Sequence, residues 1–380
     1  MLKIIEQLYN NDKPTIHELI NELKFIFPLL LRYEDTEQDE VWHAEGNVLI
    51  HTELVLDEVY KIIDTHKLSK DDKVILILSA LLHDIAKPST TVSEFSEREN
   101  RICVKAPKHE IIGRDYLSYR LLDLGINEYV YKNVLSLVAY HQVPKMLVIR
   151  NKDKSDYIHH MQMVNYNLMY HLECADIKGR ICNDTDSQLS YLDEYKMFCD
   201  EYDLNTSDSY NDVVGTYLLS RNELYSLDEA EHKLWDHKKH SRVTILCGIP
   251  GSGKSSVAIG NIISLDSIRK EIGDKNHKRS SEVINIAKER LKEYLRNKED
   301  VTYDATNYRK DFRQKLFDLC HAYHADVTLH MILKPLKQCL IDNRCRGDKQ
   351  VDDAYIIHQS NRFEFPEYGE YHRLKIDIRY

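Results

Sequence analysis

A glycine-rich run at Gly248–Ser255, GIPGSGKS, constrains the fold of this chain more than any other segment. It fits the pattern G-x-x-x-x-G-K-[ST] in full, follows the β-branched segment VTILC, and precedes SSVAIG, which we expect to be helical. In that context backbone N–H groups wrap the β-phosphate of a nucleoside triphosphate, Lys254 reaches the β- and γ-phosphates, and Ser255 offers its hydroxyl to Mg²⁺. The alternative is a glycine-rich turn with an incidental lysine. The predicted phosphate-binding residues are Gly248, Gly251, Ser252, Gly253, Lys254, Ser255 and Ser256.

The second half of the chain alternates between strand-like and helix-like segments. The strand candidates are RVTILCG, NIISLD, DVTYDAT, DVTLHMIL and LKIDIRY. Helical stretches such as SEVINIAKERLKEYLRN and KDFRQKLFDLC separate most of them. This alternation predicts a parallel sheet covered by helices.

The first half has the spacing of helices instead. NVLIHTELVLDEVYKII has apolar residues at helical intervals, and the buried run DDKVILILSALLHD begins with an acidic turn that favours a helix. Glycine is sparse and no hairpin signal is evident before residue 240. We therefore expect a multidomain protein, with an all-α helical bundle at residues 1–236 followed by an α/β domain with a parallel sheet at 237–380.

Composition limits the setting of the protein. The formal net charge is -10, which argues against a surface that coats nucleic acid along its whole length. Eight cysteines occur without a CxxC pair, which favours a reducing, cytoplasmic setting over a disulfide framework. We see no signal peptide and no segment apolar enough to span a membrane.

A set of histidines and aspartates lies in or beside the apolar helical stretches. His83 and Asp84 end the apolar run LSALLHD, where burial of two polar side chains costs free energy. Imidazole and carboxylate ligands together suit manganese, iron, cobalt, nickel or zinc, and Asp84 is the natural bridge between two ions. Since the chain has 19 histidines, a single one is more often a surface or core residue. The candidate metal ligands are His51, His83, Asp84, His109, His141 and Asp176.

Further candidates follow the strands of the second half. Asp266 comes just after NIISL, where a carboxylate can accept a proton from an attacking hydroxyl, and Arg269 lies three residues on. An acid at this place can also be only a helix N-cap. Asp304 is a candidate partner for Mg²⁺, and Arg344 and Arg346 could close over the phosphates unless they belong to a solvated basic turn.

The motifs of the first half, H-T…H-D-I-A-K…H-E-x-x-G…H…A-D-I-K-G, resemble those of the HD-domain phosphohydrolase superfamily. The resemblance implies that His51, His83, Asp84 and Asp176 hold one metal ion. It also implies that Asp84, His109 and His141 hold a second ion and that Lys87 helps to bind phosphate.

The second half resembles the P-loop polynucleotide 5'-kinase family through its glycine loop, D-x-x-R, DATN and a late R-x-R segment. The resemblance implies that Asp266 is the general base, that Arg269 contacts the acceptor phosphate, and that Arg346 embraces the triphosphate together with Lys254. The choice between Arg344 and Arg346 stays open at this point.

Together the two halves are similar to the bacterial HD-Pnk family of RNA end-healing enzymes. That resemblance implies removal of 2',3'-cyclic, 2'- or 3'-phosphates with Mn²⁺, Ni²⁺ or Co²⁺, and phosphorylation of 5' ends with ATP or another triphosphate and Mg²⁺. RNA or DNA ends would be the substrate and a polynucleotide ligase the partner. Two alternatives stay open: an HD nucleotidase fused to a nucleoside or metabolite kinase, and an HD phosphohydrolase regulated by an ATP-binding module.

Overall fold

The computed structural model describes residues 2–203, 213–221, 223, 240–274, 278–347 and 350–380. The chain forms two compact units, Met1–Asp208 and Ser209–Tyr380, and each is described by itself. The predicted division between residues 236 and 237 falls in the segment 224–239, outside the described residues, and stays a prediction.

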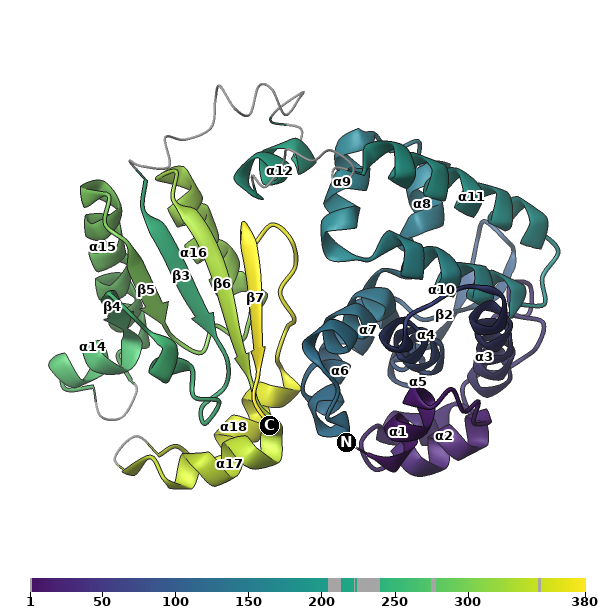
Figure 1. Cartoon of the computed structure of the whole chain (residues 1–380), viewed down its shortest axis with the longest axis horizontal. Coiled ribbons are helices and arrows are strands. Elements are labelled where there is room, and N and C mark those ends of the chain that lie inside the picture. Colours follow the sequence, from purple (N-terminus) through teal and green to yellow (C-terminus); the bar gives the residue numbers. More distant parts are fainter. Residues whose placement is uncertain (1, 204–212, 222, 224–239, 275–277, 348–349) are drawn as a thin grey trace. The chain divides into compact units, whose positions relative to one another are not determined.

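The N-terminal unit is built mainly of helices, as predicted (Figure 1). The elements before its small sheet are α1 (Lys3–Tyr9), α2 (Ile16–Leu23), the 3-10 turn η1 (Pro28–Arg32), α3 (Val48–Thr65), α4 (Lys70–Leu82) and α5 (Lys87–Thr90). Those after it are α6 (His109–Arg120), η2 (Leu121–Leu124), α7 (Glu128–Tyr140), α8 (Val143–Ile149), α9 (Lys154–Met163), α10 (Tyr166–Lys178) and α11 (Thr185–Tyr202).

Helix α4 shows why this apolar run becomes a helix rather than a strand. Ser69 caps it by accepting from the backbone N–H of Asp72, and the Asp72 side chain reaches back to the N–H of Ser69. Every residue from Val74 to Leu82 is buried, so the helix passes through the core with apolar contacts on all sides. His83 follows directly as the C-cap, which places it and Asp84 in the interior.

The N-terminal unit contains one hairpin for which the sequence carries no signal. Strands β1 (Val92–Ser96) and β2 (Arg101–Lys105) pair in antiparallel register. Their side chains are mostly exposed, so the sequence lacks the alternation of apolar and polar residues that marks a half-buried strand. The hairpin is held instead by Asp39, which accepts two hydrogen bonds of 2.8 Å from Arg101 and one of 3.0 Å from the N–H of Val104.

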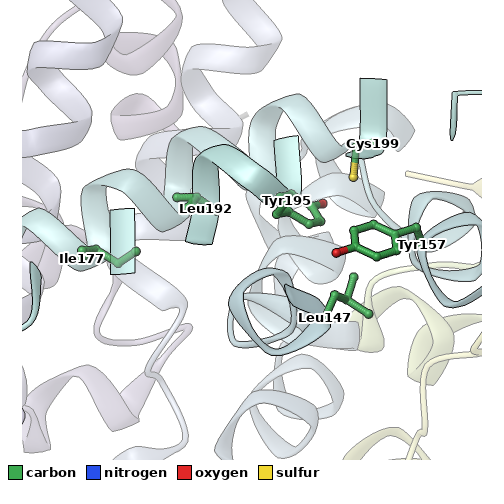
Figure 2. Packing of buried hydrophobic residues seen from close by; sticks show 6 residues of the cluster. All are labelled: Leu147, Tyr157, Ile177, Leu192, Tyr195 and Cys199. Carbon is green, nitrogen blue, oxygen red and sulfur yellow. The ribbon is translucent and has the colours of Figure 1, made fainter. Parts of the chain in front are cut away.

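A second core joins the helices from α8 to α11 (Figure 2). Tyr157 of α9 stacks on Tyr195 of α11 with ring centroids 6.3 Å apart, and Leu147 of α8 and Ile177 of α10 belong to the same buried cluster. This packing fixes α10, which carries Asp176, one residue before Ile177.

The C-terminal unit is an α/β fold, also as predicted (Figure 1). Its strands are β3 (Arg242–Cys247), β4 (Asn261–Ser264), β5 (Val301–Asp304), β6 (Asp326–Leu333) and β7 (Arg373–Ile378). They form one parallel sheet in the order β4-β5-β3-β6-β7. Its helices are α12 (Val213–Ser220), α14 (Leu265–Glu271), α15 (Ser280–Asn297), α16 (Lys310–Ala322), α17 (Leu336–Arg344) and α18 (Asp353–Asn361). Because all strands run the same way, their carboxyl ends meet at one edge, where ligands bind in such sheets.

The segment after the glycine loop does not form the helix that we expected from SSVAIG. It makes one 3-10 turn, η4 (Lys254–Val257), and Ala258 is already extended. Gly260 has a left-handed φ of 71°, and β4 begins at Asn261, so too few residues remain for an α-helix. The strand candidates NIISLD and VTILC are therefore joined by the loop and a single turn.

Candidate functional site

Buried histidine and aspartate side chains converge inside the N-terminal unit. They come from α3, from the C-cap of α4, from the start of α6, from the C-cap of α7 and from α10. The structure brings together the six predicted ligands His51, His83, Asp84, His109, His141 and Asp176, and all are buried.

Asp84 lies between two groups of histidines. Its Oδ2 is 3.2 Å from Nε2 of His83 and 3.8 Å from Nε2 of His51. Its Oδ1 is 3.2 Å from Nε2 of His109 and 4.0 Å from Nε2 of His141. Each oxygen thus faces its own pair of imidazoles, which is the arrangement of a carboxylate that bridges two metal ions.

Asp176 completes the group that contains His51 and His83. Its Oδ1 lies 3.0 Å from Nε2 of His51 and 3.9 Å from Nε2 of His83. The close approach of α10 to α3 depends on Gly179, where a Cβ would come within 2.7 Å of the Val55 side chain. A larger residue there would push Asp176 away from His51.

The hydrogen-bond partners of the histidines orient their rings as metal ligands. Three Nδ1 atoms face backbone carbonyls: Ala80 for His83 at 2.9 Å, Ala106 for His109 at 2.7 Å and Val138 for His141 at 2.9 Å. With the hydrogen on Nδ1, each Nε2 presents a lone pair to the shared space. Yet Nε2 of His83 lies 3.3 Å from that of His51, and Nε2 of His109 lies 3.4 Å from that of His141. Facing lone pairs repel, so the donor set fits a divalent cation in each group.

Charge inside the cluster supports the same assignment. Burial by itself raises the pKa of Asp84, but His83, Lys87 and His109 outweigh it and hold that pKa well below its usual range. Burial and the neighbouring His83 and His109 lower the pKa of His141 well below normal. Burial lowers the pKa of His83, but Asp84 and Asp176 outweigh it and raise that pKa, so a metal ion bound there would displace a proton.

Glu45 is a functional candidate that the sequence did not reveal. Its Oε1 lies 3.0 Å from Nδ1 of His51 and 2.8 Å from Nδ1 of His43, and its Oε2 accepts from the N–H of Ile181 at 2.9 Å. Burial raises the pKa of Glu45, but the hydrogen bonds from His43 and His51 outweigh it, so the carboxylate stays ionised. A carboxylate behind a ligating imidazole fixes its tautomer and raises its basicity.

Glu45→Gln is expected to weaken metal binding by about 10- to 100-fold, because the amide cannot hold the His51 tautomer as the carboxylate does. The measurement is a competition titration of Mn²⁺ or Zn²⁺ against a chelator on the full chain. Glu53→Gln, an exposed glutamate on the helix that carries His51, is the matched control. Wild-type affinity in Glu45→Gln would contradict the assignment.

Cations border the carboxylates of the cluster. Lys87, predicted to bind phosphate, lies 2.7 Å from Oδ2 of Asp84. Arg180 pairs with Asp176, and its Nε donates at 3.3 Å. Lys145 is also buried, and burial together with the charge of Arg180 lowers its pKa. The sequence did not single out Lys145 and Arg180, although each follows a predicted ligand by four residues.

In the C-terminal unit the glycine loop adopts a conformation that only glycine permits. Gly251 has a φ of 87°, and a Cβ there would lie 2.2 Å from the carbonyl oxygen of Cys339. Lys254 is buried, whereas Ser255 and Ser256 are exposed. The hydroxyl of Ser252 is buried without a hydrogen-bond partner. The loop therefore keeps a buried ammonium and a free hydroxyl at the carboxyl edge of β3.

Acidic and basic charges gather around Lys254. Burial lowers the pKa of Lys254, and the charge of Arg346 acts in the same direction, while Asp304 and Asp266 raise it. Asp304 ends β5, and its Oδ1 is buried without a hydrogen-bond partner. Such a carboxylate is suited to a metal ion or its water ligands.

Asp266 is not the N-cap of its helix. The cap of α14 is Ser264, whose side chain accepts from the N–H of Ser267, and the Asp266 side chain is exposed. Arg269 on the same helix donates to Asp274 at 3.2 Å and is half-buried. The capping alternative for Asp266 is thus excluded by geometry, and the carboxylate is available near Lys254.

The two candidate lid arginines differ in their surroundings. Arg344 ends α17, is exposed, and pairs with Asp353 at 3.2 Å. Arg346 follows the helix, is half-buried, and its charge acts on Lys254. This favours Arg346 as the arginine that faces the phosphates.

Two family models match the chain. Residues 48–184 match a family described as HD domain, and residues 243–366 match one described as AAA domain. These ranges contain the His/Asp cluster and the glycine loop with Asp266, while the roles of individual residues stay predictions. No curated protein matches the chain at a significant level. In the part of the chain that the structure describes, no helix combines the length and the apolar character needed to cross a membrane. The chain therefore combines a region that matches the HD domain and contains a buried His/Asp cluster able to hold metal with a P-loop region that matches the AAA domain.

Proposed function

We propose that this protein heals nucleic-acid ends with two activities: phosphorylation of 5'-hydroxyl ends and removal of 2',3'-cyclic, 2'- or 3'-phosphates. The observation that carries the proposal is the exposed carboxylate of Asp266, which follows β4 at the carboxyl edge of the parallel sheet and does not cap α14. A module that only senses ATP has no need of a base at this place, whereas a kinase needs one to accept the proton of the attacking hydroxyl.

In the kinase unit the described residues supply binding, orientation and charge. Lys254 and the loop N–H groups would hold the triphosphate, and Ser255 would offer its hydroxyl to Mg²⁺. Asp266 takes the proton from the 5'-hydroxyl group. Arg346 offsets the charge that builds up on the transferred phosphate.

An exposed aromatic side chain, Tyr355 of α18, supports a base-bearing acceptor. Burial raises the pKa of Tyr355, and the charges of Tyr308, Arg269 and Asp266 also act on it. The Tyr355 side chain is 51% exposed, which leaves its ring open to a partner. Stacking of a base on an exposed aromatic ring beside a cation is a common mode of single-strand binding.

In the HD unit, metal ions bound by the His/Asp cluster would supply a hydroxide near neutral pH and charge for the phosphate oxygens. The chain's own residues would contact the phosphate and orient the ligands. Lys87 lies close enough to Asp84 to contact a phosphate at that carboxylate. Arg180 keeps Asp176 oriented toward His51 through its ion pair.

The two activities complement each other on cleaved RNA. Cleavage that leaves a 2',3'-cyclic phosphate on one end leaves a 5'-hydroxyl on the other, and a ligase requires the opposite arrangement. A single chain with both units prepares both ends, and its product fits a polynucleotide ligase as the next enzyme.

A second candidate is a nucleotidase fused to a nucleoside or metabolite kinase. The net charge of -10 favours it, because an acidic surface repels the backbone of a long nucleic acid. Both candidates use the same residues of the glycine loop, so they differ only in the size of the acceptor.

The decisive experiment supplies labelled oligonucleotides with a 5'-hydroxyl or a 2',3'-cyclic phosphate, and free nucleosides, to the full chain with ATP. We expect phosphorylation of the oligonucleotides in Mg²⁺ alone. We expect phosphate removal to be weak in Mg²⁺ and to rise with Mn²⁺, Ni²⁺ or Co²⁺, because imidazole ligands prefer these metals. Phosphorylation of nucleosides without any of oligonucleotides would overturn the proposal and favour the second candidate.

A further inference from the structure

The phosphate loop lacks the helix that follows it in its usual context. In the fully described stretch 240–274, Lys254 opens only the 3-10 turn η4, and the chain is extended again from Ala258. In strand–loop–helix sites the aligned backbone dipoles of the helix contribute positive potential to the phosphates. A single turn contributes little of this potential, so the loop needs positive charge from elsewhere.

Arg379 lies against the end of the loop. Its Nη1 is 3.4 Å from the carbonyl oxygen of Gly253 and 3.3 Å from Oγ of Ser256. The side chain approaches so closely that a Cβ on Gly253 would lie 2.8 Å from Nη1. Gly253 has a φ of 85°, a conformation that favours glycine, and a Cβ there would displace the guanidinium.

Hydrogen bonds on the side away from the glycine loop hold Arg379 in place. Its backbone N–H donates to the carbonyl of Leu333 at 2.9 Å, which anchors it beside the end of β6. Asp377 accepts from Nε at 3.0 Å and from Nη2 at 2.8 Å. These bonds use Nε and Nη2 of the guanidinium, so Nη1 is directed toward the loop. The sheet order explains why Arg379 lies beside the glycine loop. Strand β7 is parallel to β6 and β6 is parallel to β3, so their carboxyl ends lie at one edge.

We propose that Arg379 binds the α- or β-phosphate of the nucleoside triphosphate and supplies the charge that the short η4 turn does not. This inference rests on the proposed kinase function. In the structure Nη1 faces a neutral carbonyl and a hydroxyl, both of them weak partners for a guanidinium. A phosphate oxygen is a stronger one, because both members of the hydrogen bond are then charged.

The chain offers a matched control at the other end of β7. Arg373 begins β7, at the opposite end from Arg379, and pairs with Asp326 as Arg379 pairs with Asp377. Because the strands are parallel, Arg373 lies at the edge away from the glycine loop. Arg373→Gln therefore removes a guanidinium and an ion pair from β7 without touching the phosphate site.

The test measures binding of the magnesium complex of a non-hydrolysable ATP analogue to the full chain by calorimetry. Arg379→Gln should raise its Kd by roughly tenfold or more, as loss of one charged hydrogen bond implies, whereas Arg373→Gln should stay within about twofold of the wild type. Inorganic tripolyphosphate, used as a competitor, should lose affinity in Arg379→Gln by the same factor. In kinase assays KM for ATP should rise, with kcat and the KM for the acceptor nearly unchanged.

Unchanged nucleotide affinity in a folded Arg379→Gln would overturn the inference, as would a loss of ATP binding without a loss of tripolyphosphate binding. Arg379→Lys, which keeps the charge, should recover part of the affinity, and no recovery at a normal Tm would count against phosphate binding. Failure of the kinase proposal would look different. In that case the wild-type chain would bind no triphosphate, and Lys254→Ala would not alter the binding measurement.

Discussion

Lys254→Ala is expected to reduce phosphorylation of 5'-hydroxyl ends by roughly a hundredfold or more while leaving phosphate removal intact. The lysine is buried at the glycine loop, and the charges of Asp304, Asp266 and Arg346 act on it. The His/Asp cluster belongs to the other unit of the chain and uses separate ligands.

Both activities should be measured on one preparation of the variant, together with its Tm. Lys337→Ala, an exposed lysine on α17, serves as the control and should retain both activities. A folded Lys254→Ala protein that loses both activities would show that the two sites are not independent. Full kinase activity in that variant would remove the glycine loop from the mechanism.

Asp84→Asn is expected to abolish phosphate removal, by at least roughly a hundredfold, and to lower the content of bound transition metal. One carboxylate serves both groups of histidines, with Oδ2 facing His83 and Oδ1 facing His109 at 3.2 Å each. An asparagine has the same shape but carries no charge and only one oxygen. Both groups therefore lose affinity through a single substitution.

Elemental analysis of the purified chain gives the metal content, and the two assays give the activities. Asp57→Asn, an exposed aspartate on the helix that carries His51, is the control and should match the wild type. The kinase activity should persist in Asp84→Asn. A variant that binds the full amount of metal would show that Asp84 is not the bridging ligand.

Much of the fold followed from local sequence patterns. The strand candidates of the second half, from RVTILCG to LKIDIRY, all became strands of one parallel sheet. Their β-branched runs are separated by helical stretches, and a parallel sheet with crossover helices is the fold that such a pattern permits. The run VILILSALL became a helix because its capping box and its length outweigh its strand-like composition.

Two local features were not foreseen because neighbours in space decided them. The hairpin of β1 and β2 is held by Asp39, which lies more than sixty residues before Arg101 in the sequence. SSVAIG has no strong helix breaker before Gly260, yet it stops after one turn because β4 must begin beside β5 at Asn261. Pairing in a sheet overrides weak helix propensity.

The sequence by itself determined which residues could carry chemistry, because motifs such as HD and GKS require fixed residue types at fixed spacing. Only the tertiary structure decided how those residues are supported. Glu45 bonded to the N–H of Ile181, Asp176 beside His51 and Arg379 on the glycine loop all depend on contacts between separate elements. A hydrogen bond needs two groups within about 3 Å in the right orientation, and no local pattern encodes that when the partners are far apart in the chain.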